Sequence, residues 1–574
     1  MFHKTIQAIY VVLLATFLSS CSENTSETVA HYDKIIRGGT IHDGLGSPAI
    51  EGDVAINDDR IIAVGDLSDA TADEEIDATG LVVSPGFINV LSWSVDSLIH
   101  DGRSMSELKQ GVTLEVFGEG TSMGPYTEEL KEYEETNQGD IKYDITWTTL
   151  GEYLTFLENK GISPNVASFV GATTVRKHEI GYENRLPTPE ETRRMQQLVI
   201  DAMNEGALGV GSSLIYAPAS YSDTNELIAL SQAASVCGGS YISHLRSEGN
   251  QFEEAVDELI TIAKEANLPA EIYHLKAAGK DNYHKMDMVI DRIEKLRAEG
   301  LDIRANMYSY TAGSTGLDAM IPPWIQEGGI DGWIENMQDP AKRAKALEEM
   351  QMDDAGWENL GRGSGYENVI TVGYKNPELR HLTGKTLLEI AEMRGTSPEE
   401  TAMDLVAEDG SRVGTIYFMM SEENIRKKLQ LPWVSFGSDA TSQAPEGVFL
   451  NSSTHPRAYG NFSRVLGKYV RDEKVLNLSD AIRRMTSLPA TNLKLKDRGA
   501  LAPGYFADLA IFDPQEIADV ATFEEPHQYA AGMVHVFVNG VQALKDGEHT
   551  GNFSGRFVKR DGYENQCSMD ELNL

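Results

Sequence analysis

Four side chains with metal-binding or acid–base chemistry stand where short hydrophobic segments of the chain end. They are, in chain order, Glu119, His244, His274 and Asp439. A catalytic zinc site needs about three protein ligands, drawn from histidine, cysteine and carboxylate side chains, and one open position for water. Zinc lowers the pKa of that water to about 7, which makes hydroxide available as a nucleophile. If the four segments end on one face of the molecule, these residues predict a metal site for hydrolytic chemistry.

The segments before these residues belong to a series of alternating strands and helices. Helical stretches such as 189–204, 224–234, 251–266 and 285–298 separate the strand candidates, which are 87–93, 113–117, 165–170, 208–212, 239–244, 270–274, 303–308, 415–419 and 433–437. Repeated βα units of this size indicate a parallel sheet with right-handed crossovers. About eight units indicate a (β/α)8 barrel, whose active sites lie at the carboxyl ends of the strands. Since there are nine candidates, we expect one to belong to an insertion.

The domain boundaries follow from the same pattern. The barrel is expected at residues 85–496. The stretch between Tyr310 and Thr415 is too long for a loop, so we expect an inserted subdomain at about 311–414. Short strands with turn signals occur at 33–84 and again at 497–560, and they could pair into one small β-sandwich formed by both termini.

Composition places the chain among globular proteins and limits its partners. Of 574 residues, 41% are hydrophobic and 24% are charged, which excludes a disordered or fibrous chain. The 88 acidic and 49 basic residues give a net charge of −39. A surface this acidic repels phosphate, so we expect no binding to nucleic acid. The sequence leaves the oligomeric state open.

The N-terminus has the features of an export signal. Lys4 precedes a short apolar run at 6–18, which ends at Leu18-Ser19-Ser20-Cys21 and is too short to span a membrane. The ending resembles a bacterial lipobox, in which Cys21 becomes the lipidated first residue; a plain signal peptide with a chance cysteine is the alternative. With residues 22–32 as a flexible tether, we expect an exported lipoprotein, periplasmic or anchored to the outer membrane through its lipid only.

The three cysteines are too few for a disulfide framework. If Cys21 carries lipid, Cys237 and Cys567 remain, and the sequence does not determine whether they pair. Cys237 falls at the end of a predicted helix, where we expect it as a buried space-filling residue.

Motifs spread along the chain resemble the metal-dependent amidohydrolase superfamily. The general resemblance is carried by SPGFI at 84–88, QGVT at 110–113 and APGYFADLA at 502–510. Within the superfamily, the chain is similar to the D-aminoacylase (N-acyl-D-amino-acid deacylase) group through NVASFVG at 165–171, SHLRSE at 243–248, HLKAAG at 274–279, GSD at 437–439, HPR at 455–457 and RVLG at 464–467. The resemblance covers roughly residues 33 to 560. It implies a barrel with a small β-sandwich built from both termini.

The chain departs from this family at two ligand positions. The family usually has His-x-His after the first barrel strand, but here Leu91 and Trp93 stand at those places, and neither can bind a metal. We expect both to narrow and dry the pocket floor. The family cysteine ligand is also missing, and Glu119 stands at or beside its place. One glutamate with two histidines is similar to the single-metal arrangement in N-acetylglucosamine-6-phosphate deacetylases, which implies one Zn²⁺ per chain.

The resemblance also implies the reaction. The metal ligands would be Glu119, His244, His274 and Asp439, although iron, manganese or cobalt could use the same set. A zinc-bound hydroxide would attack the acyl carbonyl, the metal would stabilise the oxyanion, and Asp439 would pass the water proton to the leaving amine. The substrate would be a small N-acyl-D-amino acid, its D-configuration resting on the resemblance alone.

Substrate contacts are expected close to the histidines. Lys276 follows His274 by two residues and therefore points to the same face by strand alternation; in the resembled family this lysine contacts the substrate carboxylate. Arg246 follows His244 in the same way, and Tyr216 could donate a hydrogen bond to the substrate. Two further candidates are Arg176 and His455.

Two other functions stay open at this point. One is a cyclic amidase or a dipeptidase for D-residues within the same superfamily, because the pocket floor has changed. The other is a metal-free barrel that serves as a binding protein on the cell surface. Retention of all four chemically active residues argues against the binding protein, and bound metal would separate the two classes.

Overall fold

The computed structural model describes residues 29–572. The expected export signal and the lipidation residue Cys21 lie outside the described residues, as does most of the expected tether. The first strand begins at His31, inside the range expected for the tether. Within residues 29–572, helices are too short or too polar to cross a membrane.

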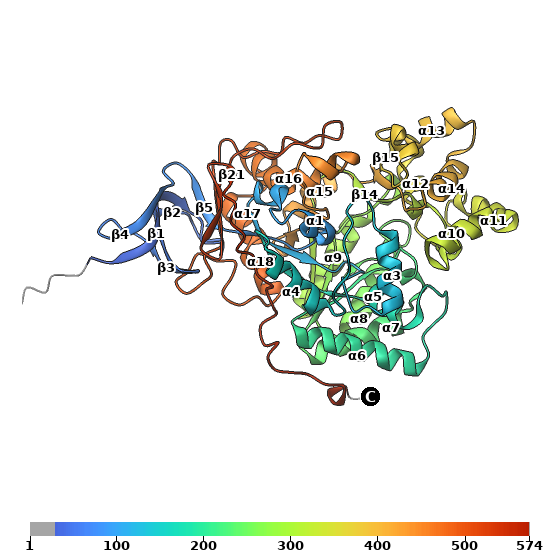
Figure 1. Ribbon diagram of the computed structural model, residues 1–574, viewed down its shortest axis with the longest axis horizontal. Helices are drawn as coiled ribbons and strands as arrows, with labels where there is room; N and C mark the ends of the chain where they lie inside the picture. The colour runs from blue at the N-terminus through green and yellow to red at the C-terminus, as the bar shows by residue number, and fades with distance from the viewer. Residues whose placement is uncertain (1–28, 573–574) are drawn as a thin grey trace, which may run out of the picture.

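A parallel barrel forms the centre of the molecule (Figure 1). Its strands, in chain order, are β6 (Phe87–Asn89), β7 (Val112–Phe117), β8 (Asn165–Ser168), β9 (Val170–Gly171), β10 (Gly209–Ser213), β11 (Ser240–His244), β12 (Ala270–Ile272), β13 (Ile303–Met307) and β17 (Val434–Phe436). They pair in the order β6-β7-β8 and β9-β10-β11-β12-β13-β17, and β8 and β9 are two halves of one strand interrupted at Phe169. The barrel closes where Asp439 N donates to Leu91 O at 2.9 Å and Trp93 N donates to Ala440 O at 3.0 Å. The predicted fold class is confirmed.

Helices cover the outside of the barrel. Those that follow the strands are α4 (Leu150–Lys160), α5 (Ala172–Ile180), α6 (Pro189–Glu205), α7 (Thr224–Val236), α8 (Phe252–Glu265), α9 (Lys285–Ala298), α15 (Glu422–Leu429) and α17 (Leu478–Met485). α6 begins with a capping box between Thr188 and Glu191 and with Pro189 in its first turn, a combination that fixes a helix start. α8 turns an apolar stripe that includes Val256 and Leu259 toward the strands.

Shorter helices lie in the loops and near the C-terminal end of the barrel sequence. They are α1 (Val95–His100), α2 (Met105–Leu108), α3 (Glu128–Asn137), α16 (Arg457–Arg464) and α18 (Ser487–Asn492). α16 continues directly into a π-helical segment at Val465–Asp472. α3 belongs to the loop after β7, so it stands beside the carboxyl ends of the strands.

A separate unit is inserted between β13 and β17. Its small antiparallel sheet has the order β14 (Gly313–Gly316), β16 (Gly414–Tyr417), β15 (Val369–Gly373). Around it lie α10 (Gly329–Gln338), α11 (Pro340–Met350), α12 (Leu360–Ser364), α13 (Leu387–Arg394) and α14 (Pro398–Asp409), drawn in yellow on the side of the barrel away from the N-terminal strands (Figure 1). The strand candidate at 415–419 corresponds to β16 and is therefore the one that does not belong to the barrel.

Strands from both ends of the chain form a second sheet. The N-terminal strands are β1 (His31–Ile41), β2 (Ile50–Asn57), β3 (Arg60–Gly65), β4 (Thr71–Asp77) and β5 (Val82–Pro85), and the C-terminal strands are β18 (Leu509–Phe512), β19 (Met533–Val538), β20 (Val541–Lys545) and β21 (Glu548–His549). β5 and β18 pair antiparallel, with Val83 opposite Ile511, and so join the two groups into one nine-stranded sheet. The sheet encloses its own core, which includes Ile36, Val54 and Phe537.

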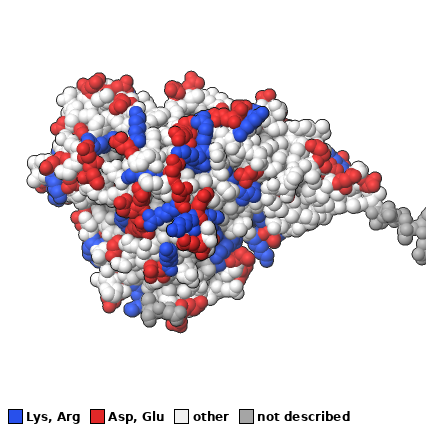
Figure 2. Space-filling model, turned by 180° about the vertical axis from the view of Figure 1, so that it is seen from behind, with Lys and Arg blue, Asp and Glu red and all other residues white. Residues whose placement is uncertain are grey.

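The face seen in Figure 2 carries both signs of charge. Lysine and arginine side chains are interspersed there with aspartate and glutamate side chains. Ion pairs such as Arg426 with Glu473, at 2.9 Å, place opposite charges next to each other. Since exposed pairs of this kind contribute only about 0–1 kcal/mol each, they are not what holds the fold together.

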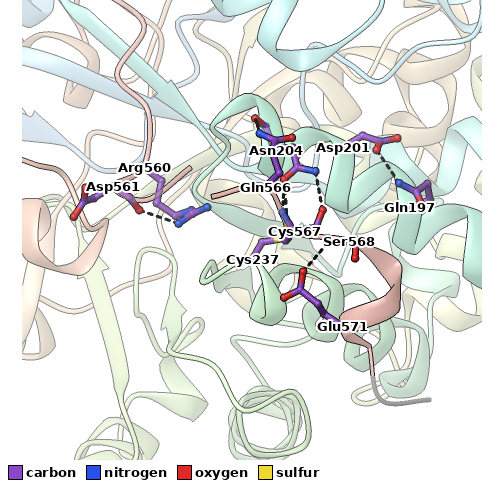
Figure 3. The surroundings of a disulfide bond; sticks show 10 residues. All are labelled: Gln197, Asp201, Asn204, Cys237, Arg560, Asp561, Gln566, Cys567, Ser568 and Glu571. Atoms are coloured by element: carbon purple, nitrogen blue, oxygen red, sulfur yellow. Dashed lines mark hydrogen bonds between the residues drawn. A yellow bond between two sulfur atoms is a disulfide. The ribbon is translucent and has the colours of Figure 1, made fainter. Parts of the chain in front are cut away.

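A disulfide bond ties the C-terminal segment to the barrel (Figure 3). Cys237, at the end of α7, is bonded to Cys567 over a sequence separation of 330 residues, with the two Cα atoms 5.3 Å apart. Asn204 of α6 holds the same segment, because its side chain accepts from Cys567 N at 2.9 Å and donates to Cys567 O at 3.0 Å. Cys237 is buried as expected, but its role is corrected: it forms a covalent bond and is not merely a space-filling residue.

Candidate active site

The four residues singled out in the sequence come to one end of the barrel. His244 is the last residue of β11, while Glu119, His274 and Asp439 follow β7, β12 and β17 by two or three residues. All four line one cavity of about 580 Å³ at the carboxyl ends of the strands. This is the end of a parallel barrel where catalytic residues gather.

Three of the four residues form a compact group. Oε1 of Glu119 lies 3.1 Å from Nδ1 of His244 and 2.9 Å from Nε2 of His274. All three side chains are buried, and one ligand atom from each lies within 4.8 Å of the others. One carboxylate and two imidazoles are a donor set that suits zinc and leaves a position for water. These residues therefore fit a metal ion.

Asp439 does not join this group as a fourth ligand. Its Oδ1 accepts a hydrogen bond from Nε1 of Trp93 at 3.1 Å, and its Oδ2 lies 2.8 Å from Nη1 of Arg457. Burial raises the pKa of Asp439 above its usual value, against the opposing effect of Arg457. A raised pKa improves a carboxylate as a proton acceptor. Asp439 thus lies outside the three-residue group, and its predicted roles as ligand and as base stay predictions.

Two of the site residues have strained backbones. His274 has φ +36° and Asp439 has φ +52°, which is the left-handed region that residues other than glycine avoid. His274 N donates to Oδ1 of Asn306 at 2.8 Å, and Asp439 N donates to Leu91 O at 2.9 Å. Such conformations cost about 1–3 kcal/mol each and persist where the surroundings hold them, often at functional sites.

A second carboxylate, Glu248, lies behind the two histidines. Its Oε1 is 3.0 Å from Nδ1 of His274, and its Oε2 is 3.6 Å from Nε2 of His244, so it faces the ring nitrogens that do not meet Glu119. Lys276 donates to both oxygens of Glu248, at 2.7 and 2.6 Å. The sequence analysis missed Glu248, although it stands four residues after His244 in the SHLRSE motif.

The acidic and basic groups of this cluster stabilise each other's charged forms. Burial alone would raise the pKa of Glu119 and of Glu248, but His274 acts against it at Glu119 and Lys276 acts against it at Glu248, with His244 adding to both. Both carboxyl pKa values fall well below their usual range. Burial and Lys276 lower the pKa of His274, but the two carboxylates outweigh them and raise it to about 9. Both carboxylates therefore stay ionised at neutral pH.

Trp93 and Leu91, which stand at the two histidine positions of His-x-His, lie in different places in the structure. Trp93 lines the cavity, in line with the expectation that it narrows the pocket floor, and its indole N–H points at Glu119. Leu91 packs in the barrel interior with Val116 and Phe169 and does not line the cavity. The expectation for Leu91 is corrected, because the barrel-closing hydrogen bond from Asp439 fixes Leu91 below the pocket.

Of the three predicted substrate contacts, two line the cavity and one does not. Tyr216 lines the cavity, with its ring 5.4 Å from the ring of His244, and Lys276 lines it as well. Arg246 is instead bonded to Glu258 at 2.8 and 2.9 Å, away from the residues that line the cavity. β11 ends at His244, so strand alternation no longer sets the direction of Arg246. Its expected role in substrate binding is corrected to a structural ion pair.

The two weaker candidates are held by structural contacts. Arg176 is fully buried in α5 and bonded to Glu226 at 2.5 Å. His455 lines the cavity, but Nε2 donates to Ala312 O at 2.9 Å and Nδ1 accepts from Arg457 N at 3.0 Å. Burial lowers the pKa of His455 well below its usual value, so the ring is neutral. Its position supports Arg457, which the sequence analysis did not single out.

Arg412, from the inserted unit, is a further residue that sequence reasoning missed. It precedes β16 and lines the cavity, with its guanidinium 4.5 Å above the ring of Tyr216. Nε donates to both oxygens of Asp318, at 2.9 and 3.1 Å, yet 46% of the arginine side chain stays exposed. It is a guanidinium held in place with room for an anion. Its sequence signal was weak, because it lies in the insertion far from every recognised motif.

The barrel and this cluster define the class of metal-dependent hydrolases. The chain belongs to the amidohydrolase family, whose model matches residues 74–543. Within that family it falls in the D-aminoacylase group. It is 33% identical to D-aminoacylase from Alcaligenes xylosoxydans xylosoxydans over 92% of this chain and 98% of the relative. It is 31% identical to N-acyl-D-glutamate deacylase from the same organism, over 92% and 97%.

Solved structures agree with this assignment. A crystal structure of D-aminoacylase superposes with a TM-score of 0.77 at 32% identity, covering 92% of this chain and all of the other. N-acyl-D-glutamate deacylase from Bordetella bronchiseptica, complexed with zinc and a phosphonate that mimics the tetrahedral intermediate, has a TM-score of 0.76 at 27% identity, covering 92% of this chain and 100% of that one. The resemblance drawn from the sequence motifs is confirmed.

Proposed function

We propose that this chain removes the acyl group from N-acyl-D-amino acids and that it uses one zinc ion. The observation that carries the proposal is the convergence of Glu119, His244 and His274 on one point, beside Asp439, in a cavity that also presents Arg412. The relatives named for D-amino-acid deacylation support the substrate class.

The metal site would be held by the oxygen of Glu119 and by one nitrogen of each histidine. When bound there, zinc supplies Lewis-acid activation of water and of the substrate carbonyl. Asp439 accepts the proton of the attacking water and returns it to the departing amine. Trp93 donates a hydrogen bond to Oδ1 of Asp439, and Arg457 forms an ion pair with Oδ2, so the two residues together hold the carboxylate in one orientation for this transfer.

The substrate carboxylate needs a cation that is exposed to the cavity, and the side chain of Lys276 is only 3% exposed. The ammonium of Lys276 already faces Glu248, and it lies 2.6 Å from Nδ1 of His274. Arg412 is half exposed in the cavity and is stacked over Tyr216, so its guanidinium can bind a carboxylate through two parallel hydrogen bonds. We therefore assign the carboxylate contact to Arg412, with Tyr216 beside it, and a supporting role to Lys276.

One metal per chain is part of the proposal. D-aminoacylase has a binuclear metal centre, in which one metal activates the enzyme and the second attenuates it. Activation by one metal supports a one-metal mechanism for a chain with a single three-residue group of ligands in its described part.

We also propose that the protein is an exported lipoprotein, with lipid at Cys21. The disulfide between Cys237 and Cys567 supports export, because such bonds persist in oxidising compartments and are rare in the cytosol. Radiolabelled palmitate incorporation, compared between the full chain and its Cys21→Ser variant, tests the anchor. Equal labelling of the two would overturn it.

The substrate proposal is tested on the purified, zinc-loaded mature chain with matched pairs of compounds. We expect hydrolysis of an N-acyl-D-amino acid, with little for its L-enantiomer or for the N-acyl amine that lacks the carboxylate. Arg412→Met should raise KM about 10-fold or more for the carboxylate-bearing substrate, because a charge-assisted contact contributes about 1.5–3 kcal/mol. Arg394→Met, at an exposed pair with Glu408 in the same inserted unit, is the matched control.

Other outcomes would replace the proposal. Cleavage of a cyclic amide or of a dipeptide with D-residues, but not of N-acyl-D-amino acids, would establish the alternative hydrolase. A chain that binds no metal after reconstitution would exclude the mechanism and favour a binding protein.

A further inference from the structure

Trp93 lies between the two carboxylates of the site. Its indole N–H is shared by Oε2 of Glu119 at 3.0 Å and Oδ1 of Asp439 at 3.1 Å. These are not the oxygens that face the histidines and Arg457: Glu119 meets the histidines through Oε1, and Asp439 meets Arg457 through Oδ2. One donor thus fills the space between two inward oxygens.

The backbone fixes Trp93 in this place. Trp93 N donates to Ala440 O at 3.0 Å, and Asp439 N donates to Leu91 O at 2.9 Å, so the segments after β6 and β17 are paired here. Trp93 and Asp439 are therefore held in a set register by the closure of the barrel. The seam of the barrel thus fixes the backbone from which the indole reaches the two carboxylates.

Two carboxylate oxygens that converge on one point attract a cation. In this chain the point is occupied by an N–H group, which carries a partial positive charge and has no lone pair in the ring plane to offer a metal. An indole also fills far more volume than an imidazole. It can satisfy the two oxygens, but it cannot act as a ligand.

We propose that Trp93 takes the place of a second metal ion and limits the site to one. The inference rests on the proposed function, since it presumes that the group formed by Glu119, His244 and His274 holds the first metal. It goes further by assigning the metal number to one residue. The second position is then latent: the carboxylates of Glu119 and Asp439 remain, and the indole occupies the space between them that a divalent cation would need.

Metal content tests this without any assay of activity. The metal-free protein is exposed to a 100-fold excess of zinc, passed through a desalting column and analysed for zinc per chain. We expect one zinc ion in the wild type and two in Trp93→His, which restores a ligand between Glu119 and Asp439. Trp93→Ala, which only empties the space, should bind a second zinc more weakly. Trp324→Phe, which removes an indole bonded to Glu349 in the inserted unit, should keep one.

The double variant Trp93→His with Asp439→Asn locates the extra ion. It should return to one zinc, because the second position loses its carboxylate and the first does not use Asp439. Thermal melting of each zinc-loaded variant confirms that it is folded.

Each outcome bears on a different claim. Two zinc ions in the wild type would overturn the role of Trp93 but would still be compatible with a two-metal hydrolase. One zinc ion in both Trp93→His and Trp93→Ala would also overturn that role but would be compatible with a one-metal hydrolase. No zinc in the wild type would overturn the proposed function together with this inference.

Discussion

The imidazole of His274 lies between two carboxylates: its Nε2 is 2.9 Å from Oε1 of Glu119, and its Nδ1 is 3.0 Å from Oε1 of Glu248. A metal-binding histidine commonly donates its second ring N–H to a carboxylate, which fixes the tautomer and the orientation of the ring. Glu248 is placed to accept from His274, whereas Nε2 of His244 lies 3.6 Å from its other oxygen, beyond hydrogen-bonding distance. One outer carboxylate therefore orients His274 and adds its charge beside His244, and Lys276 balances that charge.

Replacing Glu248 tests this arrangement. Glu248→Gln keeps the size of the side chain but removes the charge that the histidines and Lys276 face. We expect zinc affinity to fall about 10–100-fold, the usual loss when a supporting carboxylate is removed, as measured by competition with a fluorescent chelator. Glu258→Gln, which breaks the ion pair with Arg246 outside the cavity, serves as control. Unchanged zinc affinity in Glu248→Gln would mean that the histidines are held by the fold alone.

Asp439→Asn separates proton transfer from metal binding. The asparagine still accepts from Trp93, but it cannot take up a proton from water. We expect kcat to fall about 10²–10⁴-fold, the range that general acid–base groups contribute, while zinc content stays the same. Elemental analysis beside the rate measurement decides the question. A variant that loses its zinc would show that Asp439 is a ligand after all.

Lys428 gives stability a defined pH dependence. Its Nζ donates to Leu275 O at 2.6 Å, and burial, aided by Lys276, lowers its pKa to about 7. An unfolded lysine has a pKa of about 10.4, so between pH 7 and 10 the unfolded state binds more protons than the folded one. The penalty for burying the charge is complete below pH 7 and fades as the pH rises.

The variant Lys428→Met removes this dependence. Between pH 7 and 10, we expect the free energy of unfolding of the wild type to rise relative to that of the variant, by up to about 1.4 kcal/mol per pH unit. Urea unfolding at four pH values measures how the stability difference between wild type and variant changes with pH. The variant also loses the hydrogen bond to Leu275 O, but that loss is the same at every pH and does not affect the trend. Lys427→Met, at the neighbouring half-exposed lysine paired with Asp287, should show no such trend. A parallel pair of curves for Lys428→Met and wild type would refute the lowered pKa.

The barrel and the three residues of the metal-ligand group could be predicted from the sequence, because each depends on a local pattern. Hydrophobic runs between helices marked the strands, and the residues at their ends marked Glu119, His244 and His274. The run at 415–419 has the same pattern and yet forms β16 of the inserted sheet. Its neighbours in space, β14 and β15, decide its sheet, and periodicity alone carries no information about them.

The residues whose roles differed from the prediction depend on contacts that no local pattern encodes. Arg246 and Lys276 have the same spacing from a histidine, but Lys276 turns to Glu248 while Arg246 turns to Glu258. Both follow the end of a strand, so alternation could not choose between them. The role of Trp93 emerged only once the closure of the barrel set it opposite Asp439.

The disulfide should stabilise the fold without affecting the site. Cys237 ends α7 on the outside of the barrel, and Cys567 belongs to the C-terminal segment whose Val558 N donates to Val166 O, at the start of β8 and away from the carboxyl ends of the strands. The double variant Cys237→Ser with Cys567→Ser should lose about 2–4 kcal/mol of stability, typical for a native disulfide, and keep its zinc content and kcat. Thermal melting with and without dithiothreitol measures this: the wild type should lose stability on reduction, and the variant should not respond. Equal melting of oxidised wild type and double variant would show that Asn204 and the paired backbone hold the segment without the covalent bond.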